Sequence, residues 1–131
     1  MGAVIWHPDH GIIGEGYNRK EVDRCALRHA ELIAMEEACK RLERWRLIDC
    51  TLVSTLEPCM MCAGAIIQAR ISRVVFGAYD EKFGAMGSLY SLHLDSRTNH
   101  RFEVVSGLQG EECAKILRDF FRNRRTAKNT I

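Results

Sequence analysis

The sequence predicts an α/β fold in three layers, in which one mixed sheet of five strands has helices packed on both faces. Short apolar runs that suit strands alternate along the chain with longer segments of helical spacing, and this alternation is typical of such a fold. The length of 131 residues fits one domain with a sizeable hydrophobic core. Apolar residues make up 47% of the sequence and charged residues 27%, which is the balance of a globular protein. We therefore expect residues 1–131 to form a single domain.

The amino-terminal third is expected to contain two strands and a helix. Residues 2–6 and 11–16 indicate strands that are joined by a turn containing Pro8 and Gly11. In residues 30–45 the apolar side chains recur at helical spacing, which predicts a helix with one buried face. That face consists of Ala30, Ala34, Ala38 and Leu42, and it is widened by Ile33, Met35 and Trp45.

The rest of the chain is expected to add three strands and two helices. Strands are predicted at residues 50–56, 72–76 and 102–106, and a helix of mostly small residues at 59–70. Residues 77–88 carry three glycines and are predicted to form an irregular loop. A closing helix at residues 111–125 precedes a tail at 126–131, and its inward side chains are expected to be Cys113, Ile116, Leu117 and Phe120.

The amino terminus and the charge distribution limit the possible locations and partners. No apolar run approaches the length that spans a bilayer, and residues 1–6 lack the pattern of a signal peptide. We therefore expect a cytoplasmic protein with reduced thiols, in which close cysteine pairs are interpreted as metal ligands. The net charge is only +2, but basic residues gather near the carboxyl end: Lys115, Arg118, Arg122, Arg124, Arg125 and Lys128. Such a basic end suits phosphate contacts, and a solvated helix face explains the same pattern equally well.

Three residues have the spacing of metal ligands. His29 opens the segment His29-Ala30-Glu31, and Cys59 and Cys62 form a C-x-x-C pair directly after Pro58. A C-x-x-C pair in the first turn of a helix lets both sulfurs face one ion, and the positive helix end favours the thiolates that bind metal. Two thiolates and one imidazole leave the fourth zinc position for water, which is typical of a catalytic site.

Glu31 makes these ligands a candidate for catalysis. A carboxylate beside a zinc-bound water can take its proton, because the metal lowers the pKa of that water toward neutrality. A C-x-x-C pair alone is also typical of a redox pair or of half a structural zinc site, and an isolated H-x-E is common by chance. The combination, in this order and with Pro58 in place, favours a zinc-dependent deaminase of a nucleobase over those alternatives.

Further segments match one family of deaminases. They are Gly14-Glu15-Gly16-Tyr17-Asn18, Trp45-Arg46-Leu47, Thr55-Leu56-Glu57-Pro58-Cys59, Met61-Cys62-Ala63-Gly64-Ala65, residues 74–78, Asp80, residues 84–89, Asn99-His100-Arg101 and Phe120-Phe121-Arg122. On these residues the sequence resembles the bacterial tRNA-specific adenosine deaminases, the TadA family of the cytidine deaminase-like superfamily. The resemblance extends from Gly2 to about Arg125. It implies a cytidine deaminase-like fold.

The resemblance also implies a function. The family hydrolyses adenosine to inosine at the wobble position of tRNA, with one Zn²⁺ per subunit and, here, Glu31 as the proton shuttle. By resemblance, Asn18 hydrogen-bonds the flipped nucleoside, and Asp80 accepts from a ribose 2′-hydroxyl, although a loop acid is more often simply solvated. Phosphate contacts are expected from the basic end that includes Arg122. Phe121 there is either a stacking face or a core residue. The expected partners are a tRNA anticodon stem-loop and a second copy of the chain in a homodimer.

Two departures from the family pattern are visible. Family members usually have an additional helix before the strand at residues 2–6, so we expect the fold to lack that first helix. Arg28 stands before His29, where a small residue is more typical, and a cation there suits an RNA phosphate or is solvated. Glu57, next to Pro58, is expected to support the ligand loop rather than to take part in the chemistry.

Two other functions remain open on the sequence alone. One is a deaminase of free bases, nucleosides or nucleotides, such as guanine or cytidine, since these enzymes share the metal motif. The other is a non-catalytic, zinc-stabilised RNA-binding module. Glu31 argues against the second, because a purely structural zinc site needs no proton shuttle.

Overall fold

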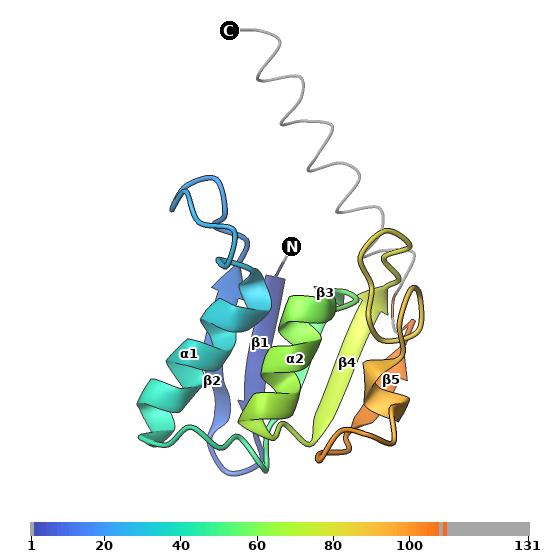
Figure 1. Ribbon diagram of the computed structural model, residues 1–131. Coiled ribbons are helices and arrows are strands. Elements are labelled where there is room, and N and C mark those ends of the chain that lie inside the picture. Colours follow the sequence, from blue (N-terminus) through green and yellow to red (C-terminus); the bar gives the residue numbers. More distant parts are fainter. Residues whose placement is uncertain (1, 108, 110–131) are drawn as a thin grey trace, which may run out of the picture.

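A mixed sheet of five strands forms the centre of the protein, as the computed structural model shows for residues 2–107 and 109, the part of the chain that it describes (Figure 1). The strands lie in the order β2-β1-β3-β4-β5. Strand β1 is antiparallel to both β2 and β3, whereas β3, β4 and β5 run parallel to one another. The predicted fold class is therefore confirmed. The strand bounds are β1 Gly2–His7, β2 Gly11–Tyr17, β3 Thr51–Leu56, β4 Arg73–Ala78 and β5 Glu103–Ser106.

Two α-helices, α1 (Ala30–Leu42) and α2 (Met60–Ala69), lie side by side on the same face of the sheet (Figure 1). A short 3₁₀ helix, η1 (Leu92–Leu94), follows in the long connection between β4 and β5. The helix expected at residues 111–125 and the tail after it lie outside the described residues. Within the described part, no helix is long and apolar enough to cross a membrane.

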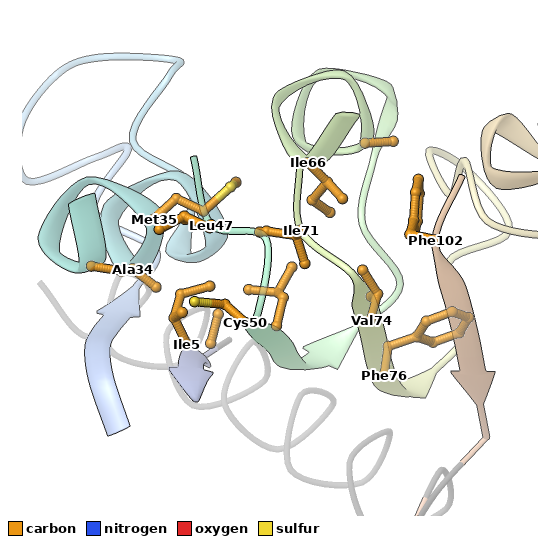
Figure 2. Close-up of a cluster of buried hydrophobic side chains, with 14 of the residues drawn as sticks. Ile5, Ala34, Met35, Leu47, Cys50, Ile66, Ile71, Val74, Phe76 and Phe102 are labelled. Carbon is orange, nitrogen blue, oxygen red and sulfur yellow. The ribbon is translucent and has the colours of Figure 1, made fainter. Parts of the chain in front are cut away.

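The register of the strands separates a helix-facing row of side chains from an outward-facing row. Ile5, Leu52 and Val74 are paired across β1, β3 and β4, and all three are fully buried beneath the helices. Figure 2 shows this core, to which both helices contribute, for example with Met35 and Ile66. The residue adjacent to each of these along its strand faces the other way, because side chains alternate along a strand. This outward row consists of Val4, Val53, Val75 and Val105.

Two glycines of β2 allow α1 to pack directly against the strand. A Cβ atom added at Gly14 would lie 2.1 Å from the carbonyl oxygen of Ala34, and one added at Gly16 would lie 2.3 Å from that of Ala30. Both distances are far below an ordinary contact. The absence of side chains at these positions therefore fixes how closely the first turns of α1 approach the sheet.

The first helix ends three residues earlier than predicted. Glu43 takes a left-handed conformation (φ 55°), and its amide donates to the carbonyls of Cys39 and Lys40, which closes the helix. Trp45 therefore does not extend the buried face, and the prediction for this residue is wrong. Its ring is 58% exposed, and the guanidinium of Arg46 lies 4.8 Å from the ring centroid.

The fourth strand is longer than predicted. Residues 77 and 78 were expected to begin an irregular loop, but the parallel pairing with β3 continues until Ala78 lies opposite Leu56. The amide of Glu57 then donates to the carbonyl of Ala78 over 2.8 Å. Pairing between distant strands thus overrides the local signal of Gly77.

Candidate metal centre and active site

The amino-terminal ends of α1 and α2 bring together the three residues with ligand spacing. His29 is the N-cap residue of α1, Cys59 is the N-cap residue of α2, and Cys62 lies in the first turn of α2. No side chain caps either helix end by a hydrogen bond. The unpaired amides and the helix dipoles therefore favour negative charge at this point, which suits cysteine thiolates.

The two nitrogen–sulfur distances at this point fit one tetrahedral ion. The Nδ1 atom of His29 lies 3.6 Å from Sγ of Cys59 and 3.5 Å from Sγ of Cys62. A zinc ion about 2.3 Å from each sulfur and about 2.05 Å from a nitrogen requires a nitrogen–sulfur separation of about 3.6 Å at tetrahedral angles. Among the described residues, these three form the only group of His, Cys, Asp and Glu side chains close enough to hold a metal. They leave a fourth coordination position that no protein side chain in the described residues takes.

The two thiols differ in how readily they lose a proton. The hydrogen bond from Cys62 lowers the pKa of Cys59 to about 5, and it outweighs burial, which acts in the opposite direction. The same hydrogen bond raises the pKa of Cys62, and burial and the nearby Glu31 raise it further. The pair thus shares one proton, which a metal must displace before it binds both sulfurs.

Glu31 lies in the first turn of α1, two residues after His29, and its side chain is only 6% exposed. Burial raises the pKa of this carboxyl group, although the hydrogen bonds that it accepts from its own amide and from Cys62 counteract the effect. The carboxyl group is therefore beside the ligand atoms and holds a proton more readily than an exposed glutamate. Both properties suit a group that carries protons to and from a ligand.

Glu57 has the opposite environment, although it is even less exposed, at 2%. Burial would raise its pKa, but hydrogen bonds from Ser88, Asp80 and Met86 outweigh this and lower the pKa of the carboxyl group. The side chain is thus a buried carboxylate bound to the loop after β4. Because its oxygens are already engaged, this arrangement fits the expected supporting role better than proton transfer.

The segment before His29 is tied together by ion pairs. Arg19 and Arg28 both bind the carboxylate of Asp23, over 3.0 and 3.2 Å, and Arg28 also reaches Glu36 of α1 over 3.2 Å. Arg28 is therefore already paired with acids, and it fixes the chain that leads into the ligand His29. Sequence reasoning missed these pairs, although Arg19 and Asp23 have the spacing of an ion pair in a helical turn.

The other predicted contact residues have different outcomes. Asn18 follows β2 and accepts a hydrogen bond from the amide of Lys20 over 2.9 Å. Asp80 is half-buried in the loop after β4, and its Oδ1 atom accepts from the amide of Lys82. Phe121 and Arg122 lie outside the described residues. Ser88, which donates to Glu57, was not singled out by the sequence, because nothing local marks a serine 31 residues away as a partner.

The sequence is similar to known deaminases over nearly all of its length. A family profile described as MafB19-like deaminase matches residues 1–125. The tRNA-specific adenosine deaminase of Haemophilus influenzae is 47% identical over 128 residues, which cover 98% of this chain and 74% of that protein. The enzyme of the same name from Bacillus subtilis is 48% identical over 117 residues, or 89% of this chain and 73% of that protein.

Comparison with solved structures also finds deaminases. A structure from a study of A-to-I editing by tRNA:A34 deaminases at the wobble position has a TM-score of 0.83 at 39% identity, and the match covers 88% of this chain and 83% of that chain. A guanine deaminase from Nitrosomonas europaea has a TM-score of 0.76 at 27% identity, with 91% of this chain and 71% of that chain covered.

Together, the sheet, the paired helix ends and the His-Cys-Cys group define a deaminase with a cytidine deaminase-like fold. Within that class, the identity to curated enzymes is close to one half over nearly the whole chain. The chain belongs to the family of tRNA-specific adenosine deaminases.

Proposed function

We propose that this protein hydrolyses adenosine to inosine at the wobble position of tRNA. The observation that carries the proposal is the buried Glu31 carboxyl group beside three ligand atoms whose nitrogen–sulfur separations match a tetrahedral ion. The names of the relatives supply the substrate, since the same site could serve other amines.

The donor set favours zinc, with one ion per subunit. Two thiolates and one imidazole are one of the three-ligand sets of catalytic zinc sites, and they leave room for one water. His29 would bind through Nδ1, and Cys59 and Cys62 through their sulfurs. A zinc ion bound there would polarise this water and lower its pKa toward neutrality.

Glu31 is assigned the proton transfers. Its carboxylate takes a proton from the attacking water and passes it to N1 of adenine, while the water oxygen adds to C6. A second proton from the same water then moves through Glu31 to the leaving amine, and ammonia departs as the C6 carbonyl of inosine forms. The overall reaction consumes one water and releases one ammonia, so atoms and charge balance. The raised pKa of Glu31 suits both halves of this cycle.

RNA recognition is assigned to residues around the site. The target base has to leave its loop to reach the ligands, and Asn18 is placed by resemblance against the flipped nucleoside. Asp80 is the proposed acceptor from a ribose 2′-hydroxyl, while Phe121 and Arg122 would contact the anticodon stem-loop. We also propose that the protein acts as a homodimer in the cytoplasm, as the family resemblance implies.

The test is to incubate the zinc-loaded protein with an anticodon stem-loop that carries a wobble adenosine. Inosine in the digested RNA, measured by mass spectrometry together with released ammonia, is the expected result. Guanine, cytidine and free adenosine serve as parallel substrates, because a guanine deaminase shares the fold. Ammonia from guanine and none from the stem-loop would replace the proposal by a free-base deaminase. RNA binding without ammonia at full zinc occupancy would indicate a non-catalytic module.

A further inference from the structure

A single buried carboxylate holds the loop that follows β4. The two oxygens of Glu57 accept hydrogen bonds from the amides of Asp80 (3.0 Å), Met86 (2.8 Å) and Ser88 (3.1 Å), and from the hydroxyl of Ser88. All four donors belong to the loop at residues 79–91. A buried carboxylate requires such donors, and the loop lacks the regular structure that would otherwise pair its amides.

The same loop lies directly against the metal-ligand segment. The amide of Ala85 donates to the carbonyl of Pro58 over 2.9 Å, and Gly84 forms an isolated bridge with Cys59. A Cβ atom added at Gly84 would lie 2.3 Å from the Glu57 carboxyl carbon. A side chain at that position would have to displace the Glu57 carboxyl group, so the loop packs directly against this carboxylate.

Asp80 is the residue at which this network reaches the proposed substrate contact. Its amide donates to Oε1 of Glu57, and its carbonyl accepts from Gly84 over 2.8 Å. Its Oδ1 atom accepts from the amides of Lys82 (3.1 Å) and Phe83 (3.2 Å). Within the described residues, the Oδ2 atom has no hydrogen-bond partner. The backbone of Asp80 is thus held on both sides, while one carboxylate oxygen is left for a ligand.

We infer that Glu57 is a positioning residue that acts through Asp80: it fixes Asp80 in the loop that pairs with the metal-ligand segment and so sets the preference for ribose-containing substrates. This inference rests on the proposed function, because it deepens the role given there to Asp80. Glu57 itself makes no contact with substrate in this scheme. It instead determines the position of the Asp80 carboxylate, which is the proposed acceptor from the 2′-hydroxyl.

The two oxygens of Glu57 are not equivalent, and this makes a sharp test possible. Oε2 accepts from two backbone amides, those of Met86 and Ser88, which cannot reverse their role. Oε1 accepts from one backbone amide, that of Asp80, and from the Ser88 hydroxyl, which can rotate to accept instead. A glutamine is therefore expected to place its nitrogen at the Oε1 position. Glu57→Gln would then lose the contact with Asp80 and keep the others.

The experiment compares Glu57→Gln with Ser88→Ala, which removes one donor to the same oxygen but leaves all three backbone amides. Matched RNA and DNA hairpins with one target adenosine give kcat and KM for each, and metal content is measured on the same samples. Glu57→Gln is expected to lower the RNA-to-DNA ratio of kcat/KM about tenfold at unchanged zinc content, as the loss of one charge-assisted hydrogen bond would. Ser88→Ala is expected to change the ratio by less than about twofold.

A merely structural role is separated by combining Glu57→Gln with Asp80→Ala. If Glu57 acts through Asp80, Glu57→Gln leaves the ratio unchanged once the Asp80 side chain is absent. Effects on the ratio that multiply in the double variant would overturn the inference. So would an unchanged ratio in Glu57→Gln when Asp80→Ala alone lowers it.

Hydrogen exchange tests the positioning independently of activity. In the unaltered protein, the amide of Asp80 is expected to exchange slowly because it is bound to a buried carboxylate. Glu57→Gln should accelerate this exchange, and Ser88→Ala should not. Rapid exchange at Asp80 in the unaltered protein would refute the positioning role even if Glu57→Gln does not fold. Slow exchange of the Asp80 amide in a protein that deaminates no hairpin would instead show that the proposed function is wrong while the positioning of Asp80 is correct.

Discussion

Replacing Gly16 by alanine tests whether the contact between β2 and α1 places the first metal ligand. The added Cβ atom would lie 2.3 Å from the carbonyl oxygen of Ala30 and 3.0 Å from the amide nitrogen of Ala34. Both atoms belong to the backbone of α1, so no side chain can rotate away. An ordinary contact begins at 3.4 Å, so the first turn of α1 has to move by the difference, 1.1 Å.

This displacement is expected to affect both stability and metal binding. Overpacking of this kind costs about 1–3 kcal/mol, which lowers Tm by roughly 4–12 °C in a domain of this size. Zinc–ligand distances tolerate only about 0.2 Å. Because Ala30 is directly next to His29, the shift should also weaken zinc binding, by about tenfold or more.

The assays are thermal unfolding by circular dichroism and competition with a zinc chelator. Gly64→Ala is the matched control, because a Cβ atom at Gly64 meets nothing within 4 Å. Gly64 lies inside α2, where alanine favours the helix by about 1 kcal/mol. The control should therefore melt at the same temperature or higher and bind zinc normally. A Gly16→Ala protein with the Tm and zinc affinity of the unaltered chain would refute the reasoning.

Two further predictions concern side chains at and away from the site. Asp80→Asn should lower the RNA-to-DNA ratio of kcat/KM on matched hairpins by about threefold to tenfold, because an amide is a weaker acceptor from a 2′-hydroxyl than a carboxylate. Unchanged relative rates on the two hairpins would count against this role of Asp80. Burial raises the pKa of Cys50 to about 11, so at pH 8 only about one thiol in a thousand is ionised. The native protein should therefore resist alkylation at Cys50 until the pH approaches 11, as peptide mass spectrometry would show, and fast alkylation at pH 8 would contradict the buried position.

The parts of the structure that could be predicted from the sequence are those that depend on local pattern. Apolar spacing indicated α1, a run of mostly small residues after Pro58 indicated α2, and both helices begin within a residue of the expected position. The ligand spacing placed Cys59 and Cys62 on one helix end, and His29 at the start of the other. These features follow from contacts within a few residues, which the order of the chain determines directly.

Most of the features that were missed depend on residues far apart in the chain, whereas the error at Trp45 has a local cause. Trp45 fits the helical spacing, but the left-handed Glu43 ends α1 before it. The partners of Glu57 lie between 23 and 31 residues away, and their amides carry no signal in the sequence. The proximity of Gly16 to α1 likewise appears only when the strand and helix are packed together.

The most direct test of the central claim is a comparison of Glu31→Gln with the unaltered protein in both metal content and inosine formation. Loss of the proton carrier should reduce kcat by about 10²–10⁴-fold, while zinc remains at one ion per chain because His29, Cys59 and Cys62 are intact. Cys59→Ala serves as the contrasting variant, and it should lose the metal together with the activity. Near-normal turnover by a zinc-loaded Glu31→Gln protein would contradict the account.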